Sequence, residues 1–325
     1  MLNIRFILKM LGRMFLLETL FMLAATGVAF LYGENDRFPF LISSGLMAAT
    51  GFLFCALGFR AKEKAAGRRE GMLIVSLIWV LFSLYGMLPF LLGGYIDNIT
   101  DAFFETMSGF TTTGSSILTD IERLPHGILF WRSLTQWQGG IGMVVFTVAL
   151  LPIFGGVSSQ MFDAETTGTG ISQERFLPRI TQVAKRLWGL YLFLTFVVIG
   201  LLWLGPMNLF DAVNHGLATI STGGYSTKNS SIGFWHSAYV EYVVTLFMFI
   251  GATNMTLIYF SLNGRVKKLL RDEEFRWYVG LVLLAIAATG LWIYHLGFAD
   301  GVEVAFRKAA FQVVTLVTTC GFATD

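Results

Sequence analysis

The sequence has few charged residues. Aspartate, glutamate, lysine and arginine make up 14% of its 325 residues, while 55% are hydrophobic and the mean hydropathy is +0.66. About a quarter of the residues in soluble domains are charged, so this composition excludes a soluble globular protein and predicts an integral membrane protein. The formal net charge of +2 is nearly neutral, and no nucleic acid partner is expected.

Residues that form disulfides or bind metals are also scarce. The two cysteines, Cys55 and Cys320, have no paired spacing, which excludes a disulfide framework. Three of the four histidines, His126, His236 and His295, are scattered near the ends of apolar segments and form no ligand set. The sequence therefore predicts no metal centre of the zinc type and no covalent cofactor.

Long apolar runs dominate what is present. Seven segments reach the length needed to cross a bilayer, about 20 residues. The first follows three basic residues but is too long for a signal peptide core and lacks a clean cleavage motif, so an uncleaved span is expected. The predicted spans are 14–32, 38–59, 71–93, 126–154, 186–205, 235–261 and 277–297.

The lysines and arginines predict the orientation, because cytoplasmic loops collect them. Seventeen of the 23 fall on one side of this layout, and that side includes the amino terminus. The amino terminus is therefore predicted to be cytoplasmic. The other six are Arg37, Arg123, Arg132, Lys228, Arg307 and Lys308.

A short polar pattern occurs three times between these spans. Residues 105–116, 215–226 and 312–323 align without a gap and place Gly114, Gly224 and Gly321 at one position. The glycines are 110 and 97 residues apart, so the repeating unit is a membrane module rather than a local turn. The pattern predicts a pore that is built from repeats.

Each copy is expected to be a half-helix that enters from outside, stops at mid-membrane and returns as an irregular loop. Residues 101–110 would form a helix of about 15 Å, half the hydrocarbon thickness. Irregular backbone at that depth must be buried or line a water-filled path, and a helix carboxyl end favours a cation. The predicted helix starts are Thr100 with Asp101, Asn208 with Asp211, and Asp300 with Glu303.

The residue types suit a monovalent cation. Peptide carbonyls of related loops can form a ring of oxygens around a dehydrated ion. Threonine and serine can bond the local backbone or add a ligand, and glycine permits positive φ and close approach. The hydroxyl and glycine cores of the copies contain no carboxylate, which argues against a divalent ion.

Several pieces resemble one known family. SGFTTTGSS, WRSLTQWQGGIGMVV, ATISTGGYST and TTCGF resemble the Trk/Ktr/HKT superfamily of potassium transporters, most closely the bacterial TrkH type. The resemblance implies an all-α integral membrane fold with helix–pore loop–helix modules around a pseudo-fourfold pore and two extra amino-terminal helices. It implies K+ uptake, with K+ as the transported ion, by symport or as a channel.

The same resemblance implies the site. A glycine at position 114 favours K+, because serine there accompanies sodium preference in the plant relatives. Apart from the resemblance, Glu105, His215 and Gln312, nine residues before each glycine, are expected to bond the backbone behind the filter, because a polar group at that depth needs a partner; the alternative is that they face lipid or water and have no role. The filter residues are Thr111, Thr112, Thr113 and Gly114; Ser221, Thr222, Gly223 and Gly224; and Thr318, Thr319, Cys320 and Gly321.

The expected organisation follows from these repeats. Residues 1–70 would form the two extra helices, 71–185 repeat one, 186–276 repeat two and 277–325 an incomplete repeat three. A fourth repeat and its gating parts are expected to be missing, and three loops alone are not expected to form a sealed pore. The resemblance also implies a homodimer in the bacterial inner membrane, contacts with membrane lipid, and gating by a cytosolic nucleotide-binding TrkA-type subunit.

Two other functions remain open on the sequence. An intramembrane enzyme would use Cys320 or Asp325 as a nucleophile, but it needs a base within hydrogen-bond reach, and none recurs beside the hydroxyl runs. A non-conducting scaffold subunit is the other alternative. Replacing Gly114 with serine separates them, because only a filter would change its ion preference.

Overall fold

The computed structural model describes residues 2–61, 68–140, 142 and 177–324, and all regular elements within these ranges are helices. They form two compact units. The first comprises Met1–Thr111 and Arg123–Trp188, and the second comprises Thr112–Glu122 and Gly189–Asp325. The second unit therefore holds the loops that follow all three short helices.

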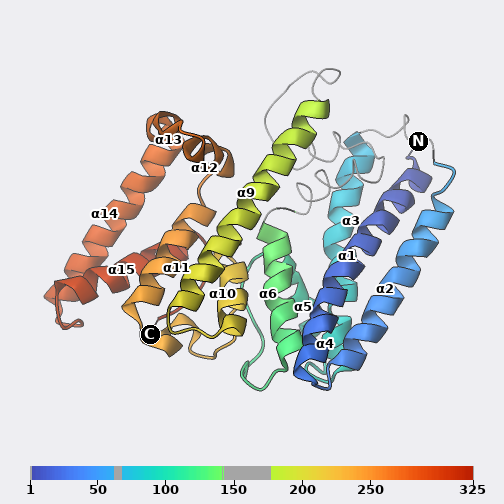
Figure 1. Ribbon diagram of the computed structural model, residues 1–325, viewed down its shortest axis with the longest axis horizontal. Helices are drawn as coiled ribbons and strands as arrows, with labels where there is room; N and C mark the ends of the chain where they lie inside the picture. Colours follow the sequence, from blue (N-terminus) through green and yellow to red (C-terminus); the bar gives the residue numbers. More distant parts are fainter. Residues whose placement is uncertain (1, 62–67, 141, 143–176, 325) are drawn as a thin grey trace. The chain divides into compact units, whose positions relative to one another are not determined.

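The first unit is organised around α1 (Ile4–Tyr32) and α2 (Arg37–Leu57), which lie side by side in Figure 1. Gly12 lets the two backbones touch, because a Cβ there would lie 2.6 Å from the Cys55 nitrogen. The ring of Phe15 contacts Phe82 and Tyr85 of the third helix edge-on. The remaining helices are α3 (Arg68–Gly86), α4 (Leu88–Leu92), α5 (Ile99–Phe110) and α6 (His126–Gly140).

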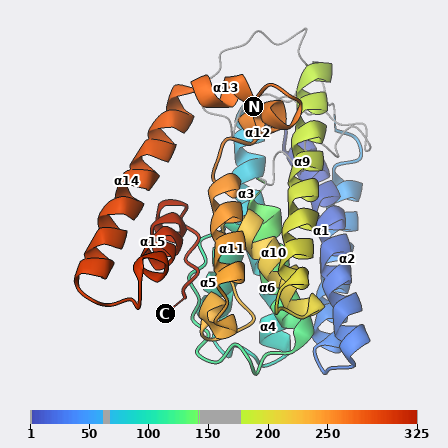
Figure 2. The same ribbon diagram turned by 60° about the vertical axis from the view of Figure 1, so that its left-hand side comes forward.

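The second unit contains the residues of α9 (Leu177–Leu204) from position 189 onward and the helices that follow it. Figure 2 shows α14 and α15 joined as neighbours at one end of this unit. The elements are α10 (Leu209–Ile220), the 3-10 helix η3 (Ser231–Trp235), α11 (Ala238–Gly251), α12 (Met255–Leu262), α13 (Val266–Arg271), α14 (Glu273–His295) and α15 (Val302–Val317).

The described residues bear out five of the seven predicted spans: the first, second, third, fifth and seventh. Five helices in the described residues are long and apolar enough to cross a membrane. The predicted sixth span, 235–261, is wrong as a single helix, because α11 and α12 meet at a bend of 107°. Asn254 accepts a bond from the Thr256 N–H and starts a new helix there. Of the predicted fourth span, α6 covers residues 126–140, and residues 141 and 143–154 lie outside the described residues.

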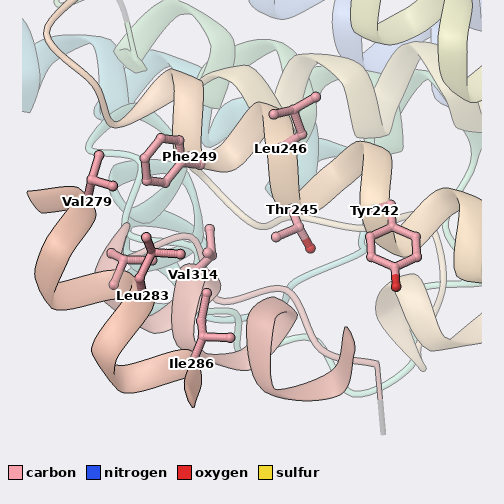
Figure 3. A pocket seen from close by; sticks show the side chains of 9 residues that line it. Tyr242, Thr245, Leu246, Phe249, Val279, Leu283, Ile286 and Val314 are labelled. Carbon is pink, nitrogen blue, oxygen red and sulfur yellow. The ribbon is translucent and has the colours of Figure 1, made fainter. Parts of the chain in front are cut away.

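A lateral cavity of about 260 Å³ lies between α11, α14 and α15 (Figure 3). Its lining is almost entirely apolar, so it offers a cation no ring of oxygens and is separate from the candidate site. Tyr242, at one end of it, donates its hydroxyl to Glu303. The lining residues are Tyr242, Thr245, Leu246, Phe249, Val279, Val282, Leu283, Ile286 and Val314.

Candidate functional site

The three short helices end at the same repeat position. α5 ends at Phe110, α10 at Ile220 and α15 at Val317, and the next residue caps each helix. Those caps, Thr111, Ser221 and Thr318, are the residues that the alignment places three before the glycine. The sequence alignment therefore matches a structural equivalence.

The helix starts agree only partly with prediction. Asn208 caps α10 by accepting from the Asp211 N–H at 2.8 Å, as expected. The cap of α5 is Asn98, which accepts from the Thr100 N–H, so the predicted cap at Thr100 is wrong by two residues, whereas Asp101 lies in the first turn as expected. α15 begins after Gly301 without a side-chain cap, and Glu303 lies in its first turn.

A glycine lies at a close contact between each short helix and the long helix that precedes it. A Cβ on Gly86 of α3 would lie 2.7 Å from Thr106 of α5. A Cβ on Gly216 of α10 would lie 2.4 Å from Ile199 of α9, and one on Gly290 of α14 would lie 2.8 Å from Phe306 of α15. A larger residue at any of these glycines would therefore require a neighbouring side chain to move.

The hydroxyl group of each capping residue bonds its own helix. Thr111 Oγ1 donates to the Met107 carbonyl at 2.8 Å, Ser221 Oγ to Leu217 at 2.9 Å and Thr318 Oγ1 to Val314 at 2.8 Å. The predicted bonding of small hydroxyl residues to the local backbone is confirmed at all three positions. The hydrogens of these three hydroxyl groups are therefore bound by the backbone of the preceding helix.

Each loop uses the same unusual backbone. The residue two before the glycine has positive φ, 54° at Thr112, 51° at Thr222 and 56° at Thr319. A β-branched residue in this left-handed region is strained, at about 1–2 kcal/mol each. The predicted positive φ of the glycines is confirmed as well, with 74° at Gly114, 81° at Gly224 and 84° at Gly321.

Hydrogen bonds close the second and third loops onto their helices. The N–H groups of Thr222 and Gly223 donate to Thr219 and Ala218 at 3.0 and 2.8 Å. In the third loop the N–H groups of Thr319 and Cys320 donate to Leu316 and Thr315 at 3.1 and 2.9 Å. This is the Schellman arrangement, usually completed by glycine, here with threonine in the left-handed position.

The three loops meet within the second unit. A Cβ on Gly114 would lie 2.2 Å from the Gly223 carbonyl oxygen and 3.2 Å from that of Cys320, and one on Gly224 would lie 1.9 Å from the Cys320 oxygen. Glycine is therefore required where one loop approaches the next. Around the corresponding point on Gly321, no described atom lies within 4 Å.

The predicted support residues make three different contacts. Glu105 Oε1 accepts from Arg132 Nε of α6 at 2.9 Å in a fully buried ion pair. His215 Nδ1 bonds the Asp211 carbonyl at 2.8 Å, and its Nε2 bonds Ser226 Oγ at 2.9 Å. Gln312 Nε2 donates to Thr324 Oγ1 at 3.4 Å. His215 thus bonds the backbone in the first turn of its own helix rather than that of a loop, whereas these bonds of Glu105 and Gln312 go to side chains.

The sequence did not predict that Arg132 is the partner of Glu105. The predicted layout grouped Arg132 with the residues on the outer side, although the structure places it 2% exposed within the first unit. A single arginine within an apolar helix was the available signal, because buried charges at membrane depth need a partner. Asp325, named for the enzyme alternative, lies outside the described residues, and Cys320 is fully buried.

Apolar spans together with short helices that end in three equivalent loops define a multi-pass membrane protein with re-entrant segments. Comparison with known proteins agrees with this class. The chain belongs to the TrkH family, since the family model described as "Cation transport protein" matches residues 47–325. It is thus a member of a transport family and not of an enzyme family.

Individual relatives are similar over almost the whole chain. The Trk system potassium uptake protein TrkH of Salmonella typhimurium is 36% identical over 99% of this chain and 67% of its own length. TrkH of Escherichia coli (strain K12) is 40% identical over 81% of this chain and 55% of its own length. The crystal structure of the potassium transporter TrkH from Vibrio parahaemolyticus has a TM-score of 0.86 at 34% identity, covering 100% of this chain and 66% of that one. The chain therefore spans between 55% and 67% of these relatives.

Proposed function

We propose that the chain contributes the selectivity filter of a potassium uptake protein and that K+ is its transported substrate. One observation carries the proposal: three loops with the same strained backbone meet, so that the Gly223 and Cys320 carbonyls lie against the glycines of neighbouring loops. Such strain persists only where the surroundings hold it, and it concentrates at functional sites.

The chemistry follows from the oxygens available. Thr111, Thr112 and Thr113, then Ser221, Thr222 and Gly223, and then Thr318, Thr319 and Cys320 would turn their carbonyls toward the ion. Neutral carbonyl dipoles replace the water of a monovalent cation at little cost when they are held in place beforehand. The carboxyl ends of α10 and α15 would add negative potential.

The topology and the partners are part of the same proposal. The distribution of basic residues supports a cytoplasmic amino terminus in the bacterial inner membrane. Names of the relatives refer to a Trk system, which supports association with a cytosolic TrkA-type subunit that gates the pore. A homodimer and lipid contacts complete the proposed assembly, and the repeat boundaries at residues 71, 186 and 277 belong to it.

Ion-dependent stability of the purified chain tests the proposal without requiring conduction. A ligand that binds only the folded state raises its stability by about 2.7 kcal/mol at 100 times its Kd. We expect K+ to raise the unfolding temperature at concentrations where Na+ does not. Gly114→Ser should reduce this preference, because its Cβ meets the Gly223 oxygen.

Gly297→Ser is the matched control. Gly297 has φ 71° and no described atom within 4 Å of the Cβ position, so this variant should lose some stability and keep the K+ preference. Equal stabilisation by K+ and Na+ in the parent chain would refute the proposal. An unchanged preference in Gly114→Ser would favour a scaffold subunit.

A further inference from the structure

The loop that follows Gly224 contacts the segments that follow Gly114 and Gly321. We call residues 225–237 the outer bracket. It includes η3 and has two strained positions, Ser231 and His236, with φ of 52° and 44°. The described contacts connect it to the segments that follow Gly114 and Gly321.

Asn229 holds the segment that follows the first filter loop. Its side-chain Oδ1 accepts from the Ile121 N–H at 2.7 Å, and its Nδ2 donates to Asp120 Oδ1 at 3.2 Å. Its backbone N–H donates to Glu122 Oε1 at 3.2 Å. One residue thus makes three hydrogen bonds to three consecutive residues that lie 107 to 109 positions away.

Ser231 and Gly233 hold the segment that follows the third filter loop. The Gly233 N–H donates to the Ala323 carbonyl at 3.1 Å, and Ser231 Oγ accepts from the Ala323 N–H at 3.2 Å. Both polar groups of Ala323, two residues after Gly321, are therefore bound by the bracket. A Cβ on Gly233 would lie 2.5 Å from the Thr324 oxygen, so glycine is needed for this approach.

The start of the bracket is anchored within the second repeat. Ser226 Oγ bonds His215 of α10 and also accepts from the Lys228 N–H at 3.0 Å. The preceding Tyr225 is buried and donates its hydroxyl to the Ser115 carbonyl at 3.4 Å. The outer bracket thus connects the segments that follow all three filter glycines to α10.

We propose that Asn229 and Ser231 are positioning residues for ion discrimination. The inference rests on the proposed function of the loops as a filter. Neither residue would touch the ion. They hold the segments after the first and third filter loops at a fixed separation. The ring of carbonyls between the strained loops then keeps a constant width, and this width distinguishes K+ from Na+. Without the bracket, exposed exit segments would move as surface loops usually do.

The test compares the K+ and Na+ concentrations that half-maximally stabilise the purified chain. Asn229→Ala should lower the Na+/K+ ratio of these concentrations by a factor on the order of 3 to 10, the equivalent of about one hydrogen bond. Ser231→Ala should act in the same direction. Ser230→Ala is the matched control, since Ser230 is exposed and makes no side-chain cap for η3. It should leave the ratio unchanged.

A charge exchange separates positioning from general stability. Asn229→Asp keeps an acceptor for Ile121 but opposes Asp120, so the ratio should fall. Adding Asp120→Asn restores a donor and acceptor pair, and the ratio should recover. An unchanged ratio in Asn229→Ala, or no recovery in the double variant, would overturn the inference. If the parent chain shows no K+ preference, that result refutes the proposed function. The inference about Asn229 and Ser231 is then refuted as well, because it rests on that function.

Discussion

Gly224 and Gly321 allow the contact between loops to be tested separately from backbone strain. Both residues have nearly the same φ, 81° and 84°, but a Cβ on Gly224 would lie 1.9 Å from the Cys320 oxygen while none of the described atoms lies within 4 Å of the same point on Gly321. Alanine at either position takes on the left-handed strain, about 1–2 kcal/mol. Only Gly224→Ala must also displace a filter carbonyl.

The size of the displacement follows from the contact distance. Contacts of a Cβ below 3.0 Å essentially do not occur, so the Cys320 oxygen must move by about 1 Å. A shift of that size changes the coordination of an ion, whereas the φ strain alone changes only stability. We therefore expect Gly321→Ala to lose about 1–2 kcal/mol of stability and to retain K+ stabilisation.

The assay measures the unfolding temperature of each purified variant against K+ concentration. In Gly224→Ala, the stabilisation of about 2.7 kcal/mol that the parent gains at 100 times its Kd should largely disappear. Gly297→Ala, with φ 71° and an open Cβ position, controls for strain outside the filter. If Gly224→Ala and Gly321→Ala showed the same K+ dependence, contact between the loops would not determine ion binding.

Three further predictions concern the support of the loops. Arg132→Leu should destabilise the chain by about 3–5 kcal/mol, because it leaves Glu105 charged and buried. A double variant that also carries Glu105→Leu should recover most of that loss in thermal unfolding. Equal destabilisation in the single and the double variant would contradict the pairing. His215→Gln should leave the half-maximally stabilising K+ concentration unchanged. His215→Leu should lower the free energy of unfolding by about 1–3 kcal/mol, because it removes the histidine that bonds Ser226. Loss of K+ stabilisation in the glutamine variant would contradict this prediction. Thr222→Gly should raise stability without K+ by about 1 kcal/mol, because it relieves the strain at φ 51°. It should weaken K+ binding, because glycine lets the loop adopt more backbone conformations. Tighter binding would show that the restricted conformation of Thr222 has no role.

The positions of the short helices and their loops could be predicted because the relevant signals are local. A hydroxyl residue, a left-handed position and a glycine recur in three aligned copies, and the helix ends at Phe110, Ile220 and Val317 follow from them. The cap at Asn208 could be predicted for the same reason. Its side chain bonds an N–H only three residues away.

Features that depend on distant partners could not be predicted. The bend after Gly251 lies within a continuous apolar run, and hydropathy does not distinguish one long helix from two. Gly251 and Asn254 are the local signs of a break, but neither residue type by itself requires one. The pairing of Glu105 with Arg132 spans 27 residues, and that of Asn229 with Ile121 spans 108. Residue types alone do not fix such pairs, because they arise from the packing of separate helices and loops.

The most direct measurement locates the ion itself. Crystals of the protein grown with Tl+ in place of K+ would show, by anomalous scattering, where a dehydrated monovalent cation binds. The account predicts a peak among the loops that contain Gly114, Gly224 and Gly321, within coordination distance of their peptide carbonyls. Anomalous peaks confined to carboxylates at the surface, with none among these loops, would contradict it.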